Sequence, residues 1–205
     1  MGRRIRSSLR KVPVQERSRR RLDAIVAAAA ELFAEAGFEA TTTEAIAARA
    51  RTSIGSLYQF FPNKLAVFRA VAERCLERTG EVFAEIFSAE GAPVDDLGAL
   101  IDTSVDAFAA LQEREPAFKA IIANLQLYGE YEEADAEMSR QFAAVVEALL
   151  AARAPKLEAA RRPLVATTLV QTTGALLVLT ARGGDPRVLG ELKRMLRRYI
   201  EPELD

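Results

Sequence analysis

Hydrophobic residues recur every three or four positions along almost the whole chain, and this spacing predicts α-helices. The face of the first helix runs through Leu22, Ile25, Val26, Ala29, Leu32 and Phe33. Gly37, with the hydrophobic Phe38 just after it, predicts the end of this helix. No alternating run is long enough to predict a β-strand, so the pattern indicates an all-α fold of about nine helices.

Glycine and proline residues mark the boundaries of the longer helices. One helix begins at Lys64 and reaches about residue 89, where Gly91 and Pro93 break the pattern. Later helices are predicted at about 95–113, 116–128, 130–153, 158–181 and 186–200. The first 16 residues are rich in arginine and serine, which is typical of a flexible arm.

Two much shorter helices are predicted between residues 41 and 61. Thr42 or Thr41 can cap the first, and Glu44, three residues after Thr41, completes a capping box. Ser53 can cap the second, and Asn63 can cap the long helix that follows. Helices this short must pack on their neighbours at a steep angle, as in a helix-turn-helix. That arrangement predicts that the second helix enters a DNA major groove.

The distribution of charge supports a nucleic-acid partner. The whole chain has a net charge of −1, but residues 1–64 hold 12 Lys and Arg against 6 Asp and Glu, and residues 65–205 hold 16 against 23. A basic N-terminal part suits a phosphate backbone, whereas the acidic remainder is repelled by it. A solvated basic tail on an ordinary helical protein is the alternative, and the neighbouring helix-turn-helix pattern favours DNA.

The composition argues against an enzyme and against a metal site. The chain has no histidine and one cysteine, Cys75, and it lacks a phosphate-binding glycine loop or an activated-nucleophile motif. We therefore expect no cofactor and no transition-metal site. A single thiol favours a reducing, cytoplasmic setting. The Arg-rich start before the run 24–30 imitates a secretion signal, but its apolar part is short and Glu31 follows it.

The segment 163–181 carries no charge and is long enough to span a membrane. Its five threonines, Gln171 and Gly174 dilute its apolar character, and the rest of the chain reads as a water-soluble protein. We interpret it as a buried helix that packs within the core or against a partner, not as a membrane span.

The residues around the two short helices resemble the TetR family of bacterial transcriptional regulators. The resemblance covers about residues 19–79 densely, and it is only architectural beyond them. The matching positions are Gly37-Phe38, Thr41-Thr42, Ile46-Ala47, Ser53, Gly55, Leu57, Tyr58, Phe61 and Lys64. Arg51 departs from the pattern, because the family favours glycine at this turn position, and Thr52 stands where a small apolar residue is usual.

The resemblance implies an arm at 1–16, a DNA-binding domain at 17–79 with its motif at 42–61, and a helical effector-binding and dimerisation domain at 80–205. The DNA-contacting residues that it implies are Arg19, Arg20, Thr42, Thr43, Arg51, Ser53, Ile54, Gly55, Ser56, Tyr58, Gln59 and Lys64. Tyr58 as a core aromatic residue and Lys64 as a solvated charge are alternatives. The arm arginines Arg3, Arg4, Arg6 and Arg10, with Lys11, either lie along a minor groove or form a solvated tail.

The resemblance also implies a small-molecule effector and a homodimer that binds a near-palindromic operator, usually as a repressor. Candidate residues for contact with an apolar effector are Phe83, Phe87, Phe108, Phe118, Ile122, Leu125, Tyr128, Phe142 and Gln171, and Asn124 and Gln126 are further polar candidates. Aromatic residues at this spacing are also typical of plain core. Candidate dimer-interface residues are Val170, Gly174, Leu177, Leu189, Leu192 and Leu196.

Overall fold

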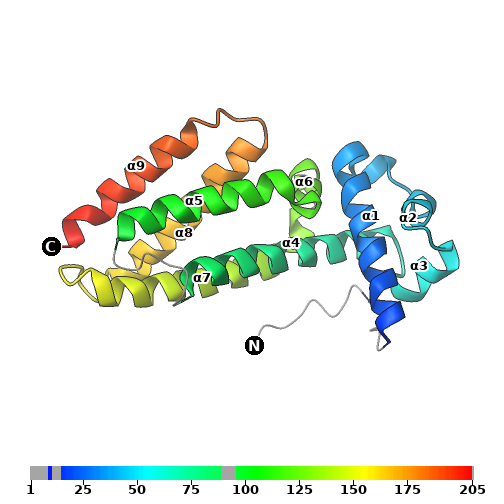
Figure 1. Ribbon diagram of the computed structural model, residues 1–205, viewed down its shortest axis with the longest axis horizontal. Helices are drawn as coiled ribbons and strands as arrows, with labels where there is room; N and C mark the ends of the chain where they lie inside the picture. Colours follow the sequence, from blue (N-terminus) through cyan, green and yellow to red (C-terminus); the bar gives the residue numbers. More distant parts are fainter. Residues whose placement is uncertain (1–8, 11–14, 89–95, 205) are drawn as a thin grey trace. The chain divides into compact units, whose positions relative to one another are not determined.

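The computed structural model describes residues 9–10, 15–88 and 96–204 (Figure 1). The described residues form α-helices and two short 3-10 helices and contain no strand, which confirms the predicted all-α fold. The α-helices are α1 (Glu16–Ala40), α2 (Thr43–Arg49), α3 (Ile54–Phe60), α4 (Lys64–Phe87), α5 (Leu97–Arg114), α6 (Pro116–Ala123), α7 (Glu132–Arg153), α8 (Arg162–Ala181) and α9 (Val188–Ile200). The 3-10 helices are η1 (Leu125–Glu130) and η2 (Glu201–Glu203).

The chain folds into two compact units. Unit 1 comprises Met1–Glu77 and Arg114–Ala134, and unit 2 comprises Arg78–Glu113 and Asp135–Asp205. Helix α4 therefore contributes its first part to unit 1 and its last part to unit 2. The predicted boundary between residues 79 and 80 separates two proposed functions, DNA binding and effector binding, and it stays a prediction. By packing, α6 and η1 belong to the same unit as the N-terminal helices.

The core of unit 1 lies among α1, α2, α3, α4 and α6. Ile25 and Phe33 from α1, Ile46 from α2, Leu57 from α3 and Phe68 from α4 are all fully buried in one cluster. The rings of Phe33, Phe38 and Phe68 lie 5.5 to 5.7 Å apart, in tilted and edge-on contacts. The two short helices are therefore held by a core that they share with three longer ones.

Unit 2 contains three smaller apolar clusters. Ile86 of α4 packs with Leu97 and Leu100 of α5, and Leu150 of α7 packs with Val165 of α8. Val105 of α5 packs with Leu192 and Leu196 of α9, which lies along α5 (Figure 1). Two ion pairs reinforce this last contact: Lys193 Nζ lies 2.5 Å from Asp106 Oδ1, and Arg197 pairs with Asp102.

Three predicted helix boundaries differ from the structure. The helix predicted to end at Gly37 is assigned to Ala40, but Gly37 itself has a φ of +79° and interrupts the helical backbone there, as glycine allows. The helix predicted over 116–128 ends at Ala123, and η1 follows. The helix predicted from 158 begins at Arg162, with Pro163 in its first turn. The break predicted at Gly91 and Pro93 lies outside the described residues.

Candidate nucleic-acid interface

The short helices α2 and α3 form a helix-turn-helix whose ends are capped by side chains. Thr42 Oγ1 accepts a hydrogen bond of 3.1 Å from the Ala45 amide, and Ser53 Oγ accepts one of 3.1 Å from the Ser56 amide. The Asn63 side chain caps α4 in the same way, by accepting from the Ala66 amide. These observations confirm the caps that the sequence predicts at Thr42, Ser53 and Asn63.

The predicted capping box between Thr41 and Glu44 is wrong. Thr41 is buried, and its hydroxyl donates to the carbonyl oxygens of Leu32 and Gly37, so it belongs to the end of α1. Thr42 caps α2 in its place. The Glu44 carboxylate instead accepts a hydrogen bond of 3.3 Å from the Thr43 hydroxyl.

The turn between α2 and α3 is closed by Arg51 in a left-handed conformation. Arg51 has a φ of +52°, the single positive value among the described non-glycine residues. The Arg51 amide donates to the Ala48 carbonyl, and the Thr52 amide donates to the Ala47 carbonyl. An L-residue is strained here by roughly 1–2 kcal/mol, so this departure from the family pattern carries a structural cost. The exposed Arg51 side chain brings a positive charge to the turn.

We expect Arg51→Gly to separate folding from binding. Glycine relieves the left-handed strain, so the free energy of unfolding should rise by about 0.5–1 kcal/mol after the greater entropy of unfolded glycine is subtracted. The same change should weaken DNA binding several-fold. It should also lower the slope of log affinity against log salt concentration by about 1, which corresponds to the loss of one phosphate contact. Chemical denaturation and DNA-binding anisotropy measure the two effects. Arg51→Lys is the matched control, because it keeps the charge; equal losses of affinity in both variants contradict the assignment.

Helix α3 buries one side and exposes the other. Leu57 and Phe60 are in the core, whereas Ile54 and Tyr58 are 36% and 40% exposed. The exposed residues on this helix that were predicted to contact DNA are Ile54, Gly55, Tyr58 and Gln59, and Ser53 precedes them at the cap. Ser56 is half-buried, and its hydroxyl lies 2.9 Å from that of Ser53. The structure therefore brings this set of candidates together on one surface.

Thr43 does not share that surface. It is 8% exposed, and its hydroxyl lies 3.1 Å from the Tyr58 hydroxyl. The sequence predicted a phosphate contact at Thr43 because hydroxyls at a helix N-terminus are suited to one. Burial removes this contact, and Thr43 instead joins α2 to α3 and orients Tyr58.

Lys64 also has a different partner from the one predicted. Its ammonium group donates to the carbonyl oxygens of Phe38, Glu39 and Thr41, at 2.6, 3.2 and 2.9 Å. The same group lies 4.3 Å from the centre of the Phe38 ring. All three N–H donors of the ammonium are occupied, so Lys64 caps the C-terminal end of α1 and does not offer a free charge to a phosphate.

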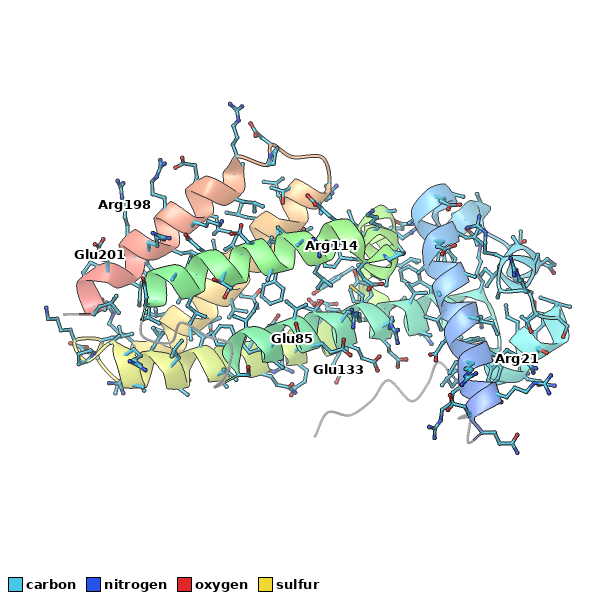
Figure 2. The ribbon with its side chains drawn as sticks, viewed as in Figure 1. Arg21, Glu85, Arg114, Glu133, Arg198 and Glu201 are labelled. Carbon is cyan, nitrogen blue, oxygen red and sulfur yellow. The ribbon has the colours of Figure 1, made fainter. Side chains whose placement is uncertain are left out.

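The first turns of α1 present the other predicted basic residues. Arg19 and Arg20 are exposed, and Arg21 projects from the same part of the helix (Figure 2). Arg20 pairs with Glu16 at 3.1 Å, but both side chains are mostly exposed, so the pair is weak and exchangeable. The guanidinium groups of Arg19 and Arg20 are therefore available to phosphates. The arm residues Arg3, Arg4, Arg6 and Lys11 lie outside the described residues.

Helix α2 is fixed on α1 by an arginine between two carboxylates. Arg49 donates to Glu31 at 2.9 Å and to Glu35 at 3.1 Å. The hydrogen bond from Arg49 holds the pKa of Glu35 below its ordinary value. Sequence reasoning did not identify this clamp, because the three residues lie 14 and 18 positions apart and share no motif.

Asn124 connects α6 with the end of α1. The side chain is 1% exposed, and its amide group donates to the Phe33 carbonyl at 3.1 Å and to the Ala120 carbonyl at 2.7 Å. Its oxygen accepts a hydrogen bond of 2.7 Å from the Phe38 amide, next to the break at Gly37. The prediction that Asn124 bonds an effector is therefore wrong, because its hydrogen-bonding groups are used within unit 1.

We expect Asn124→Ala to destabilise the protein by about 2–4 kcal/mol, since it removes the three hydrogen bonds that this buried side chain makes with the Phe38 amide and with the Phe33 and Ala120 carbonyl groups. Chemical denaturation measures the loss. Asn124→Asp is the matched comparison, because it retains an acceptor for the Phe38 amide but removes both donors. If Asn124→Ala lowers the free energy of unfolding by less than about 1 kcal/mol, the Asn124 side chain does not have the structural role that we assign to it.

The aromatic residues predicted to contact an effector fall in both units. In unit 2 the Phe83 ring stacks on Phe142 at 3.8 Å and on Phe87 at 4.3 Å, and Phe108 lies 6.5 Å from Phe142. In unit 1, Phe118, Ile122 and Leu125 are half-buried, and Tyr128 is 38% exposed. The rings in unit 2 pack on one another, as in an ordinary core, and contact of these residues with an effector stays a prediction.

Gln171 lies apart from these aromatic residues. Its side chain is exposed on α8, on the same face as Gly174, which lies three residues later. The role of Gln171 in binding an effector stays a prediction.

Three residues predicted at a dimer interface are instead inside a single chain. Leu177, Leu192 and Leu196 are 4%, 1% and 4% exposed, and the last two pack on Val105. Val170 and Leu189 are half-buried, and Gly174 is exposed. The apolar stripe of α9 was read correctly, but its partner is α5 of the same chain.

Other apolar side chains of α8 and α9 are exposed in the single chain. Leu164, Leu179, Met195 and Tyr199 are 69%, 48%, 47% and 42% exposed. Helix α8 is also the one described helix that is long and apolar enough to cross a membrane, and 17% of its most apolar window is buried. Such helices also occur in water-soluble proteins, so this finding is weak as a membrane signal. The charged residues Arg198 and Glu201 lie at the C-terminal end of α9 (Figure 2).

The described residues hold no group of three or more His, Cys, Asp or Glu side chains arranged to bind a metal ion.

Two family models match the chain. The model described as "Bacterial regulatory proteins, tetR family" matches residues 25–71, which include α2 and α3. The model described as "Tetracyclin repressor-like, C-terminal domain" matches residues 96–200, about half of the chain. No curated protein matches the chain.

Solved structures of similar proteins cover almost the whole chain. A TetR-family transcriptional regulator from Streptomyces coelicolor is 30% identical, with 90% of this chain and 99% of that chain covered and a TM-score of 0.61. NalD of Pseudomonas aeruginosa, the secondary repressor of the MexAB-OprM multidrug efflux pump, is 22% identical, with 93% and 98% covered and a TM-score of 0.61. GusR of Salmonella enterica is 24% identical, with 92% and 98% covered and a TM-score of 0.64. The last two likenesses are evidence of the fold alone.

Proposed function

Since the chain belongs to the TetR family of bacterial transcriptional regulators, we propose that it is a repressor that binds a near-palindromic operator as a homodimer and releases it on binding a small apolar molecule. Its proposed domains are the DNA-binding part at 17–79 and the effector-binding and dimerisation part at 80–205. The family consists of DNA-binding regulators, and we propose no catalytic activity and no cofactor. A regulator of this kind acts in the cytoplasm, where the operator is.

The exposed side of α3 is the observation that carries this proposal. Its buried side is fixed in the core by Leu57 and Phe60, so Ile54, Gly55 and Gln59 face outward on a rigid support. Gln59 is suited to a bidentate contact with adenine, and Ile54 to a thymine methyl group. Tyr58, held by Thr43, is suited to a phosphate contact.

Phosphate contacts around α3 complete the proposed interface. The candidates are the hydroxyl groups of Thr42, Ser53 and Ser56 and the side chains of Arg51, Arg19 and Arg20. These groups fix the register of the protein on the duplex without reading its sequence.

DNA binding tests this proposal directly. The operator duplex is sought in DNA upstream of the protein's own gene or an adjacent gene, and by selection from a random library. We expect the logarithm of the affinity to fall linearly with the logarithm of salt concentration, by roughly 0.9 for each phosphate neutralised. No binding at low salt, or binding that does not respond to salt, contradicts the proposal.

The proposed dimer uses the exposed side of α8 and α9. Leu164, Gln171, Gly174 and Leu179 are exposed on α8, and Met195 is exposed on α9. Uncharged, partly small side chains on a helix allow a second helix to approach closely and cover its apolar groups. A two-fold dimer presents two α3 helices about one DNA turn apart, ~34–36 Å or a multiple of that distance.

The proposed effector is a small, mainly apolar molecule. Phe83, Phe87, Phe108 and Phe142 gather in unit 2, which supports an apolar ligand that inserts at the edge of this aromatic cluster. To weaken operator binding a hundredfold, it must prefer the released conformation by about 2.7 kcal/mol. Helix α4 runs without a break from unit 1 into unit 2 and is the proposed connection between the two functions.

A further inference from the structure

Three side chains form a line of hydrogen bonds from the first turn of α2 to α3. The Thr43 hydroxyl lies 3.3 Å from Glu44 Oε2 and 3.1 Å from the Tyr58 hydroxyl. Thr43 is 8% exposed, whereas Glu44 is exposed and Tyr58 is 40% exposed. The buried threonine therefore joins an exposed carboxylate to the exposed phenol that we propose to contact DNA. We call these three residues the Glu44 relay.

The carboxylate fixes the direction of both hydrogen bonds in the relay. Each hydroxyl has one proton to donate, and a carboxylate has none, so Thr43 is the donor to Glu44. A bond to a charged acceptor is stronger than one to a neutral phenol, which favours this use of the Thr43 proton. The Tyr58 hydroxyl must then donate its own proton to the Thr43 oxygen. Hydrogen bonds that run in one direction in this way strengthen one another.

This direction opposes a contact between Tyr58 and a phosphate. With its proton turned toward Thr43, the phenol oxygen presents only lone pairs to a phosphate oxygen, which is also an acceptor. The contact requires that Tyr58 turn its proton outward and that Thr43 donate to Tyr58 instead. Glu44 then loses the Thr43 proton, and it has no ion pair or second side-chain hydrogen bond among the residues that the structure describes.

We propose that Glu44 is a positioning residue that limits DNA affinity, because through Thr43 it holds the proton of Tyr58 away from the phosphate backbone. This inference rests on the proposed function, in which Tyr58 contacts a phosphate. The negative charge of Glu44 also repels the duplex directly, whatever Tyr58 does. The relay predicts an effect beyond that repulsion, one that requires both the Thr43 hydroxyl and the Tyr58 hydroxyl.

The first experiment is a double-mutant cycle measured as operator affinity. Glu44→Gln removes the charge, and its amide can donate to the Thr43 oxygen, which frees the Thr43 proton for Tyr58. We expect affinity to rise about tenfold in the otherwise wild-type protein. In Tyr58→Phe or Thr43→Val backgrounds the same change should raise affinity only about twofold, which is the effect of charge alone. Glu39→Gln is the control, since this exposed carboxylate has no side-chain partner among the described residues; its effect should be the same with and without the Tyr58 hydroxyl.

The second experiment examines the free protein without DNA. The relative intensities of the tyrosine doublet in a Raman spectrum depend on whether the phenol donates or accepts a hydrogen bond. Subtracting the spectrum of Tyr58→Phe isolates Tyr58 from the other three tyrosines, Tyr128, Tyr131 and Tyr199. We expect Tyr58 to be a donor in the wild type and to shift toward an acceptor in Glu44→Gln. Thermal denaturation of each variant shows that the fold is kept.

The outcomes separate this inference from the proposed function. An equal gain from Glu44→Gln in all three backgrounds shows that Glu44 acts by charge alone and overturns the inference. A loss of affinity in Glu44→Gln also overturns it, because the carboxylate then contacts the operator favourably. An unchanged Tyr58 doublet in Glu44→Gln has the same consequence. Operator binding by α3 stands in each of these cases, whereas a wild-type protein that binds no duplex contradicts the proposed function itself.

Discussion

Gly55→Glu is expected to abolish operator binding while the protein folds at least as stably as the wild type. Gly55 is exposed in the first turn of α3, and a Cβ atom built there meets no other atom within 4 Å. Glutamate is a better helix former than glycine, and a negative charge near a helix N-terminus is favourable. Next to a DNA backbone the same carboxylate is repelled, at a cost of several kcal/mol, so we expect affinity to fall more than about 100-fold.

Gly55→Glu should raise or maintain the stability of the protein and lower its affinity for the operator, so the two effects can be measured separately. Thermal or chemical denaturation should show equal or higher stability, and binding anisotropy should show the loss. Gly55→Ala is the matched control: it adds the same Cβ without charge, should stabilise the helix by about 0.5–1 kcal/mol, and should weaken binding far less. If Gly55→Glu binds its operator as tightly as Gly55→Ala does, α3 does not face the duplex.

Local chemistry explains why the helix-turn-helix could be predicted from the sequence. Caps act over three residues, so Thr42, Ser53 and Asn63 identify the ends of their helices without any knowledge of the fold. The exposed side of α3 could also be predicted from neighbouring residues, because the apolar Leu57 and Phe60, three positions apart, indicate which side is buried. The strained turn at Arg51 was visible as a departure from a position that favours glycine.

Residue type alone could not assign the polar side chains between elements. A lysine or threonine near a helix end serves equally well as a phosphate contact or as a cap for a neighbouring helix. Lys64 caps the end of α1, and the Thr43 hydroxyl bonds the Tyr58 hydroxyl; these partners lie 15 to 26 positions away. Asn124 bonds groups 86 and 91 positions away, which no local pattern encodes.

The predicted dimer interface shows a related limit. Periodicity identifies an apolar helix face but does not name what covers it. Leu192 and Leu196 form such a face on α9, and it is covered by α5 through Val105. The ion pairs of Lys193 and Arg197 with α5 run beside this contact. Leu179 and Met195 stay exposed in the single chain, and they are apolar side chains that we propose a second subunit covers.

Gly174→Arg is expected to convert the proposed dimer to a monomer. Gly174 is exposed on α8, and a Cβ atom built there meets nothing within 4 Å, so a single subunit accommodates the arginine. In a dimer formed by this face, the same side chain occupies the space of the partner helix and buries a charge without a partner. Light scattering on size-exclusion fractions measures the mass, and the subunit should keep its helical circular dichroism.

Loss of the dimer should carry over to DNA. Two linked half-site contacts bind 10²–10⁴ times more tightly than one alone, so a monomeric Gly174→Arg should lose at least about 100-fold in operator affinity. Leu192→Ala is the matched contrast, because it opens a cavity inside one chain and should cost about 2–5 kcal/mol of stability with no preferential dissociation. A dimeric Gly174→Arg, or a monomer that retains full affinity, contradicts the interface. If Leu192→Ala instead dissociates the dimer without destabilising the subunit, the interface predicted from the sequence, which includes Leu192, is the correct one.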